Sequence, residues 1–251
     1  MGEREQHMWE TSMSNRAGVG AVKQVPHSVE AGEEVPRPPG ESALFRELRS
    51  LCERVAQVAP ACRGTSVTWT ESRVTCTLVA SDAGIAVLDA VQYVGGGPTL
   101  DVVTRGQGVE ADVAALPVEN TWGPFARATL ARGFRSVLAL PLTQHGRVAG
   151  TVTFYGGTSN AFEGAHAELI RLLEAWAPQA IAVADLALPD RLPADRPQTL
   201  RDQGMINRAV ATLATARDGD AIKARELLDD AAARAGVSSA QVAEALLQPH
   251  A

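Results

Sequence analysis

The chain has 251 residues, 45% of them hydrophobic and 21% charged, so it can bury an ordinary globular core in one large domain or two small ones. Its 23 Lys and Arg against 29 Asp and Glu give a net charge of −6, which excludes a strongly basic protein that wraps nucleic acid. The three cysteines have neither the even number of a disulfide framework nor the spacing of a zinc site. We therefore expect no metal and no cofactor.

Residues 1–40 are predicted to form a disordered arm. They contain prolines and charged residues but hardly any clustered hydrophobic side chains, so little burial is available to offset the entropy lost on ordering. This segment also lacks the apolar run of a secretion signal, and no later stretch reaches the roughly 18 consecutive apolar residues of a membrane span. We expect a soluble, cytoplasmic protein.

The segment 42–188 alternates between helical and strand patterns, which is typical of one α+β domain. Apolar residues recur at helical spacing from Leu44 to Val58, which indicates a helix. Several later segments are short, strand-like and bounded by turn residues. The expected elements in chain order are a helix over 42–58, strands over 66–70 and 74–80, a helix over 84–93, a strand over 109–113 and a helix over 122–132. Glycines at 95–97 and Pro98 end the second of these helices.

The clearest strand signal is a hairpin over 136–142 and 147–155, because Gly146 in its turn can take the positive φ that a tight hairpin needs. A long helix follows from Leu169 to Val183, interrupted or kinked at Pro178. The first and last helices of this domain carry apolar stripes that one thin sheet does not fully cover. Apolar surface of this kind favours association of two copies, so we expect a homodimer.

A stiff, non-helical linker is predicted over 189–197, which contains three prolines between charged residues. Beyond it, the segment 198–248 reads as a three-helix unit. Asp220 can cap the second helix and Gly236 can end it, while Ser238 begins a capping box for the third. The expected helices are 200–216, 220–235 and 238–247.

Several motifs within 42–188 resemble those of GAF domains, which are sensory modules with an antiparallel sheet flanked by helices. The motifs are Leu88-Asp89-x-x-Gln92-Tyr93 with Gly97-Pro98, Trp122-x-x-Phe125, Gly133 to Leu142, Gly150 to Tyr155, and Phe162. The residues at these motif positions are similar to those of GAF domains that precede an ANTAR domain in actinobacterial proteins. Thr99 stands where many of these relatives have cysteine, so the resemblance does not imply a thiol sensor here.

A GAF-type sensor implies a pocket for a small molecule, with apolar walls and a few polar groups. The candidate pocket residues at the motif positions are Gln92, Tyr93, Thr99, Trp122, Phe125, Phe134 and Phe154. The alternative is that most of these aromatic residues form plain core. The sequence does not name the ligand.

The C-terminal helices resemble an ANTAR domain, a three-helix module that binds paired RNA hairpins and prevents transcription termination. The matching apolar skeleton is Ile206, Ala209, Leu213, Ala224, Leu227-Leu228, Ala231 and Val242-Ala243. Two other parts of the module differ from those of its relatives. Ala209-Val210-Ala211 replaces the usual Ala-Lys-Gly, and Arg225 replaces an aromatic residue. Val210 cannot contact phosphate as lysine would, and its alternative role is to enlarge a packing face.

RNA binding by this module would depend on its few cations. The candidate RNA-binding residues are Arg201, Arg208, Arg217, Lys223 and Arg225. Between 198 and 251 six cations stand against seven anions, a net charge of 6 − 7 = −1, so these side chains must share one face to bind phosphates at all.

Two functions fit these features. The first is a transcription antitermination regulator, with a GAF domain for sensing or dimerisation and an ANTAR-like module for RNA binding. The alternative is a non-RNA-binding interaction or ligand-sensing protein, in which the helical module serves dimerisation or partner docking. An enzyme is not expected, since His145 and His166 have no nucleophile or carboxylate at a suitable spacing.

Overall fold

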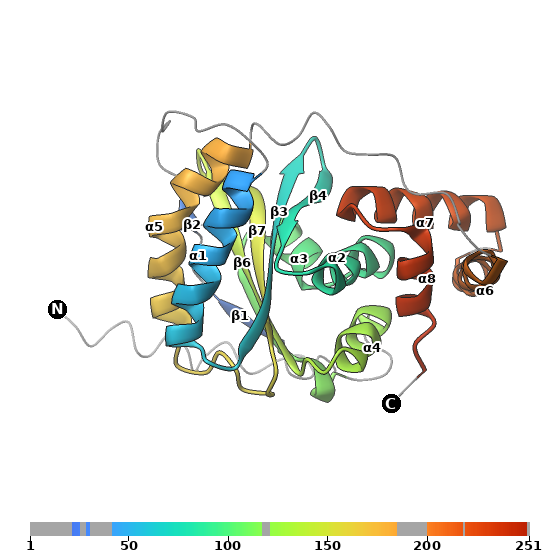
Figure 1. Cartoon of the computed structure of the whole chain (residues 1–251), viewed down its shortest axis with the longest axis horizontal. Helices are drawn as coiled ribbons and strands as arrows, with labels where there is room; N and C mark the ends of the chain where they lie inside the picture. The colour runs from blue at the N-terminus through green and yellow to red at the C-terminus, as the bar shows by residue number, and fades with distance from the viewer. Residues whose placement is uncertain are drawn as a thin grey trace.

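The computed structural model describes residues 22–25, 29–30, 42–116, 121–184, 200–217 and 219–249. These residues form an α+β fold in which helices flank both faces of a sheet, as the sequence predicted (Figure 1). The main strands are β3 (Cys62–Glu71), β4 (Val74–Ala80), β5 (Gly108–Asp112), β6 (Ser136–Gln144) and β7 (Arg147–Gly156). They pair antiparallel in the order β5-β6-β7-β3-β4.

Residues 22–25 and 29–30 add two short strands to this sheet, which differs from the disorder predicted for them, and the rest of the predicted arm over 1–40 lies outside the described residues. β1 (Val22–Val25) pairs antiparallel with β5, and β2 (Val29–Glu30) pairs parallel with the end of β6. Strands added to an existing ladder are held by backbone hydrogen bonds. They therefore form without the clustered hydrophobic residues whose absence predicted disorder.

Both predicted hairpins are present, and each closes through two residues with positive φ. Ser72 (50°) and Arg73 (69°) join β3 to β4, whereas His145 (52°) and Gly146 (72°) join β6 to β7. Two consecutive positive φ angles characterise the tight turns whose twist matches that of the flanking strands. The sequence predicted this conformation only at Gly146.

Helices α1 (Ser42–Val58) and α5 (His166–Ala184) cover one face of the sheet, and α5 continues through Pro178 without interruption (Figure 1). Their apolar stripes are buried within the chain, at most 3% exposed: Leu44, Leu48, Leu51, Val55, Leu169, Leu173 and Trp176. The Trp176 indole N–H also donates to the backbone oxygen of Glu47 over 3.0 Å. These stripes therefore do not require a second copy to cover them, and the homodimer stays a prediction without that support.

The other face carries α2 (Ala83–Gly95), α3 (Pro98–Arg105) and α4 (Gly123–Ala131), with a short 3₁₀ turn over Val113–Ala115. Helix α3 is an element that the sequence patterns did not predict. Pro98 occupies its first turn, where no amide donor is needed, and Gly106 ends it in the left-handed conformation. The Gly-rich segment therefore separates two helices and does not lead into a loop.

The C-terminal helical unit consists of α6 (Leu200–Ala216), α7 (Ala221–Ala235) and α8 (Ser239–Leu246), with the predicted caps. The Asp220 carboxylate accepts from the amides of Ile222 and Lys223, and Gly236 is left-handed after α7. Ser238 and Gln241 form the capping box that starts α8. The predicted linker over 189–197 lies outside the described residues.

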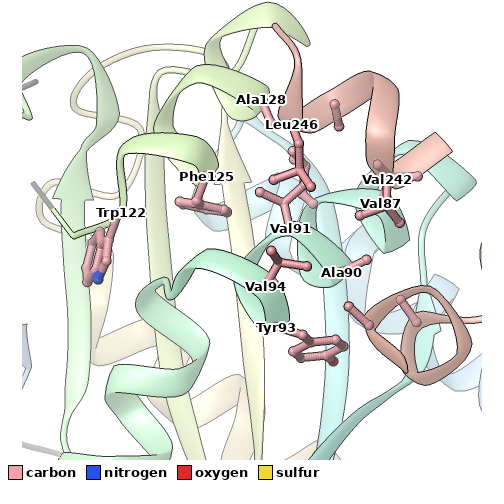
Figure 2. Close-up of a cluster of buried hydrophobic side chains, with 14 of the residues drawn as sticks. Val87, Ala90, Val91, Tyr93, Val94, Trp122, Phe125, Ala128, Val242 and Leu246 are labelled. Carbon is pink, nitrogen blue, oxygen red and sulfur yellow. The ribbon is translucent and has the colours of Figure 1, made fainter. Parts of the chain in front are cut away.

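The C-terminal helical unit packs directly on α2 and α4. Figure 2 shows Val87, Ala90 and Val91 of α2 meeting Val242 and Leu246 of α8 in one cluster of buried side chains. Leu228 of α7 belongs to the same cluster. Helix α2 is therefore enclosed between the sheet and the C-terminal helical unit, and every residue from Ile85 to Val94 is buried.

Candidate functional site

The candidate site is a cluster of buried polar side chains between α2 and the sheet, with Asp89 at its centre. Asp89, Gln92 and Tyr93 follow one another at the i, i+3 and i+4 positions of α2, so they share the helix face that looks toward the sheet. Their helix is otherwise apolar. Burial of three polar side chains at this place requires partners from the sheet, because an unpaired buried polar group is costly.

The Asp89 carboxylate receives hydrogen bonds from three sheet strands and from its own helix. Its Oδ1 accepts from Ser66 on β3 (3.0 Å), from the Tyr155 hydroxyl on β7 (3.2 Å) and from Gln92 (3.4 Å). Its Oδ2 accepts from Thr77 on β4 (3.0 Å). The two carboxylate oxygens are thus unequal, since one has three donors and the other has one.

Gln92 extends the network to α3. Its side-chain oxygen accepts from the backbone amide of Thr99 (2.8 Å), and the Thr99 hydroxyl lies 2.9 Å from that of Thr153 on β7. Gly97 makes this arrangement possible, because a Cβ there would collide with the Gln92 side chain. The Gly-Pro-Thr motif therefore positions an amide for Gln92 and is not a phosphate-binding loop.

Burial changes the protonation chemistry of the cluster. Desolvation raises the pKa of Asp89 from 3.8 to about 7, although hydrogen bonds from Thr77, Ser66 and Tyr155 oppose this shift. Desolvation and the nearby Asp89 charge also raise the pKa of Tyr93 and of Tyr155 well above the ordinary tyrosine value. Both tyrosines therefore stay neutral donors near neutral pH, while Asp89 is the group of this cluster that changes charge there.

Six of the seven predicted pocket residues lie on this side of the sheet. Gln92 and Thr99 belong to the polar cluster, and Tyr93 reaches it through Thr77, 2.8 Å from its hydroxyl. The rings of Phe125 and Phe134 pack against Tyr155 at centroid distances of 6.4 and 5.5 Å, and Trp122 belongs to the same apolar core.

Phe154 is the exception and corrects the predicted pocket. It lies in the opposite core beneath α1 and α5, with its ring 6.3 Å from that of Phe162. Neighbouring residues of a strand point to opposite faces, so Phe154 and Tyr155 cannot line the same pocket. Tyr155 is the residue of this pair that faces the site.

Sequence reasoning missed Asp89, Ser66, Thr77 and Tyr155 as site residues. The available signal was an aspartate in the middle of an apolar helix, because such a residue needs buried partners. A second signal was the alternation of hydroxyl and valine side chains in β3 and β7, which places the hydroxyl groups together on one face.

Two arginines connect the C-terminal helical unit to α2 at the edge of this cluster. The Arg234 guanidinium on α7 lies 4.6 Å from the centre of the Tyr93 ring, in a cation–π contact. Arg217, which follows α6, donates to the backbone oxygen of Val94 over 2.6 Å. Tyr93 thus contacts the polar cluster through its hydroxyl and α7 through its ring.

The structure does not bring the predicted RNA-binding residues onto one free face. Arg217 is bound to α2, Arg225 pairs with Asp229 (2.7 Å), and Lys223 pairs with Asp220 (3.2 Å). Asp229 in turn accepts from Ser239, so the Arg225 pair belongs to the contact between α7 and α8. Arg201 and Arg208 remain on exposed positions of α6.

Cys62 and His166 each have surroundings that bear on their reactivity. Desolvation raises the pKa of Cys62 to about 11, so this thiol is not a thiolate at neutral pH. His166 does have a carboxylate partner, Glu110, 2.9 Å away, and this contact ties the start of α5 to β5.

Within the described residues there is no group of three or more His, Cys, Asp or Glu that could hold a metal ion. None of the helices described is both long enough and apolar enough to cross a membrane.

No protein-family model and no curated protein matches the chain. Solved structures with a similar fold include a type II free methionine-R-sulfoxide reductase from Thermoplasma acidophilum, 14% identical, with a TM-score of 0.42 over 56% of this chain and 94% of that one. The GAF domain/HD domain protein from Geobacter sulfurreducens is 15% identical, with a TM-score of 0.40 over 61% and 99%. Escherichia coli SdiA is 12% identical, with a TM-score of 0.44 over 83% and 90%. At these values the similarity carries no conclusion about function.

Proposed function

We propose that this protein is a signalling regulator in which a GAF-like sensor domain and an ANTAR-like output unit share helix α2. The observation that supports this proposal is the complete burial of α2 between residues 85 and 94. Asp89 on this helix faces the sheet, and Val91 faces the C-terminal helical unit. A shift of α2 at the polar cluster therefore acts on the output unit directly, without a signal through 189–197.

The proposed input is a small molecule that binds among Asp89, Gln92, Thr99 and the aromatic residues around Tyr155. Such a ligand would offer hydrogen-bond donors to the Asp89 carboxylate in place of the hydroxyl groups that now satisfy it. No catalytic step is part of the proposal. We also propose that the protein is a cytoplasmic homodimer. Sedimentation at micromolar concentration tests this assembly, and a monomer would contradict it.

The proposed output is binding to paired RNA hairpins through α6. Arg201 and Arg208 are both exposed and seven positions apart, so they lie on nearly the same side of this helix. Gly204 lies between them and Ala211 lies three positions beyond Arg208, and both leave room for close approach of a phosphate backbone. This face supplies the cations that antitermination by this chain would use.

The test is binding of a fluorescent dual-hairpin RNA by the full chain at low salt, followed by anisotropy. We expect wild type to bind and the double variant Arg201→Gln, Arg208→Gln to lose most of its affinity. Arg171→Gln is the matched control, because Arg171 is an exposed arginine on α5 and is expected to change nothing. Binding that is equally strong in the double variant would exclude α6 as the RNA face.

The alternative is an interaction protein whose C-terminal helical unit no longer binds RNA. It is favoured by the use of Arg217 and Arg225 in contacts within the chain. Absence of any RNA binding by wild type at low salt would establish this alternative, whereas salt-sensitive binding would exclude it.

A further inference from the structure

A hydrogen-bonded path leads from the buried Asp89 carboxyl to the C-terminal helical unit. Thr77 donates to Asp89 Oδ2 over 3.0 Å and lies 2.8 Å from the Tyr93 hydroxyl. The Tyr93 ring then carries the Arg234 guanidinium of α7 at 4.6 Å. Three contacts in series therefore join the Asp89 carboxyl to α7.

The direction of donation along this path depends on the charge of Asp89. An ionised carboxylate only accepts hydrogen bonds. The Thr77 hydroxyl must therefore donate to Asp89 and accept from the Tyr93 hydroxyl. This order holds the Tyr93 hydroxyl against Thr77 and fixes the ring on which Arg234 rests.

Protonation reverses this order. Oδ1 already accepts from three donors, so a proton on the carboxyl belongs on Oδ2, where it points at Thr77. Thr77 then accepts from Asp89 and donates to Tyr93, and the Tyr93 O–H must turn to a different acceptor. The Thr77–Tyr93 hydrogen bond then persists with Tyr93 as its acceptor, but the Tyr93 proton loses its partner inside the buried cluster, which disfavours the ring position that Arg234 contacts.

We propose that Asp89 is a proton-operated switch for the docking of the C-terminal helical unit, acting through Thr77, Tyr93 and Arg234. The ionised form holds α7 on α2, and the protonated form loosens it. This inference rests on the proposed coupling through α2, and it is independent of whether α6 binds RNA.

The titratable and charged groups around Asp89 determine the pH range in which the switch operates. The titratable and charged side chains that act on it are Tyr93 on α2, Tyr155 on β7, Cys76 on β4, and Arg234 with its ion-pair partner Asp230 on α7, 2.9 Å away. Both tyrosines are held neutral by their raised pKa values, and the guanidinium stays charged. Since burial raises the pKa of Asp89 to about 7, Asp89 is the group that changes charge in the physiological range.

The experiment measures hydrogen-exchange protection of α7 amides from pH 5.5 to 8.5 in the full chain without RNA, with α1 amides as the internal reference. We expect α7 protection, relative to α1, to fall about threefold to tenfold on acidification, which corresponds to loss of one cation–π contact. In Asp89→Asn it should be independent of pH and equal to the acid level of wild type. In Tyr93→Phe the ring remains but the pH response should vanish.

The control is Asp101→Asn on α3, which removes a partly exposed carboxyl outside the path and should keep the full pH response. Should Asp89→Asn fail to fold, Thr77→Val breaks the path and must abolish the response with Asp89 still present. A pH response that survives in either variant, or its absence from wild type, would overturn the switch. If the pH response is absent but the chain binds RNA, the switch is excluded and the proposed RNA-binding regulator is not. If the pH response is present but the chain does not bind RNA, RNA binding is excluded and the switch is not.

Discussion

Arg217 donates a hydrogen bond from Nη2 to the backbone oxygen of Val94, 2.6 Å away, although 123 positions separate the two residues. This oxygen is among the last carbonyls of α2, which have no partner within the helix and carry the negative end of its dipole. A charged donor at this place makes a stronger bond than a neutral one. Arg217, chosen from the sequence as an RNA-binding candidate, therefore fixes the C-terminal helical unit to α2.

Replacing Arg217 by alanine should lower the free energy of unfolding by about 1–2 kcal/mol, because the Val94 oxygen loses a charged donor. Urea unfolding of the full chain measures this change. Arg171→Ala is the control, since an exposed arginine whose contacts with Glu168 and the Ala167 oxygen stay on the surface of its own helix should contribute less than about 0.5 kcal/mol. Equal effects of the two variants would contradict a specific role for the Arg217 contact.

Stability should depend on the protonation of Asp89. Its folded pKa of about 7 lies above the reference value of 3.8, so between these values the folded state holds a proton that the unfolded state has released. The contribution of Asp89 to the free energy of unfolding should therefore be greatest near pH 4 and be lost as pH rises toward 7, by at most about 1.4 kcal/mol per pH unit.

Urea unfolding of wild type and Asp89→Asn across this range isolates the effect, because other groups titrate in both proteins. We expect the variant to gain stability relative to wild type as pH rises from 4 to 7. A constant difference between the two proteins over that range would show that Asp89 does not take up a proton on folding.

Gly97→Ala should destabilise the protein by about 1–3 kcal/mol, because the new methyl group collides with the buried Gln92 side chain. The displaced Gln92 would release the amide of Thr99, which a backbone chemical-shift change at Thr99 would report. Gly204→Ala in α6 is the matched control. A Cβ there meets nothing within 4 Å, so alanine should stabilise the helix by up to about 1 kcal/mol.

The helices and strands were predictable wherever the pattern was local. The caps at Asp220, Gly236 and Ser238 are read from neighbouring residues and formed as expected. The two strands before residue 31 were not predictable in this way, because they are held by pairing with β5 and β6, far along the chain. Helix α3 was hidden by the glycines before it, which usually indicate a loop.

The sequence brought several candidate site residues together correctly and placed Phe154 on the wrong face of the sheet, while ligand binding stays a prediction. The motif residues Gln92 and Thr99 lie together, since both belong to a short segment of chain. Phe154 was misplaced because choosing aromatic residues by motif ignores the alternation of side chains along a strand. The partners of Asp89 come from three strands, so only the assembled sheet identifies them.

Arg225 was expected to contact phosphate, but its pair with Asp229 now predicts a structural effect. Arg225→Ala should lower stability, because Asp229 also accepts from Ser239 and would lose the cation that orients it. Its effect on RNA affinity should be smaller than that of Arg208→Ala. Urea unfolding and RNA anisotropy on both variants separate the two roles, and an RNA loss confined to Arg225→Ala would contradict this assignment.

Val210→Lys should tighten RNA binding at low salt. Val210 is half-buried and, like Met205 and Leu213, packs against the edge of the core, where the aliphatic part of a lysine can lie along apolar surface while its ammonium group reaches water. One added phosphate contact should steepen the dependence of log affinity on log salt by about 0.7 for a single-stranded segment. Val210→Met supplies a similar stem without the charge and should leave the slope unchanged. If both variants tighten binding equally, packing and not phosphate contact decides the role of this position; if neither does, α6 does not meet the RNA backbone here.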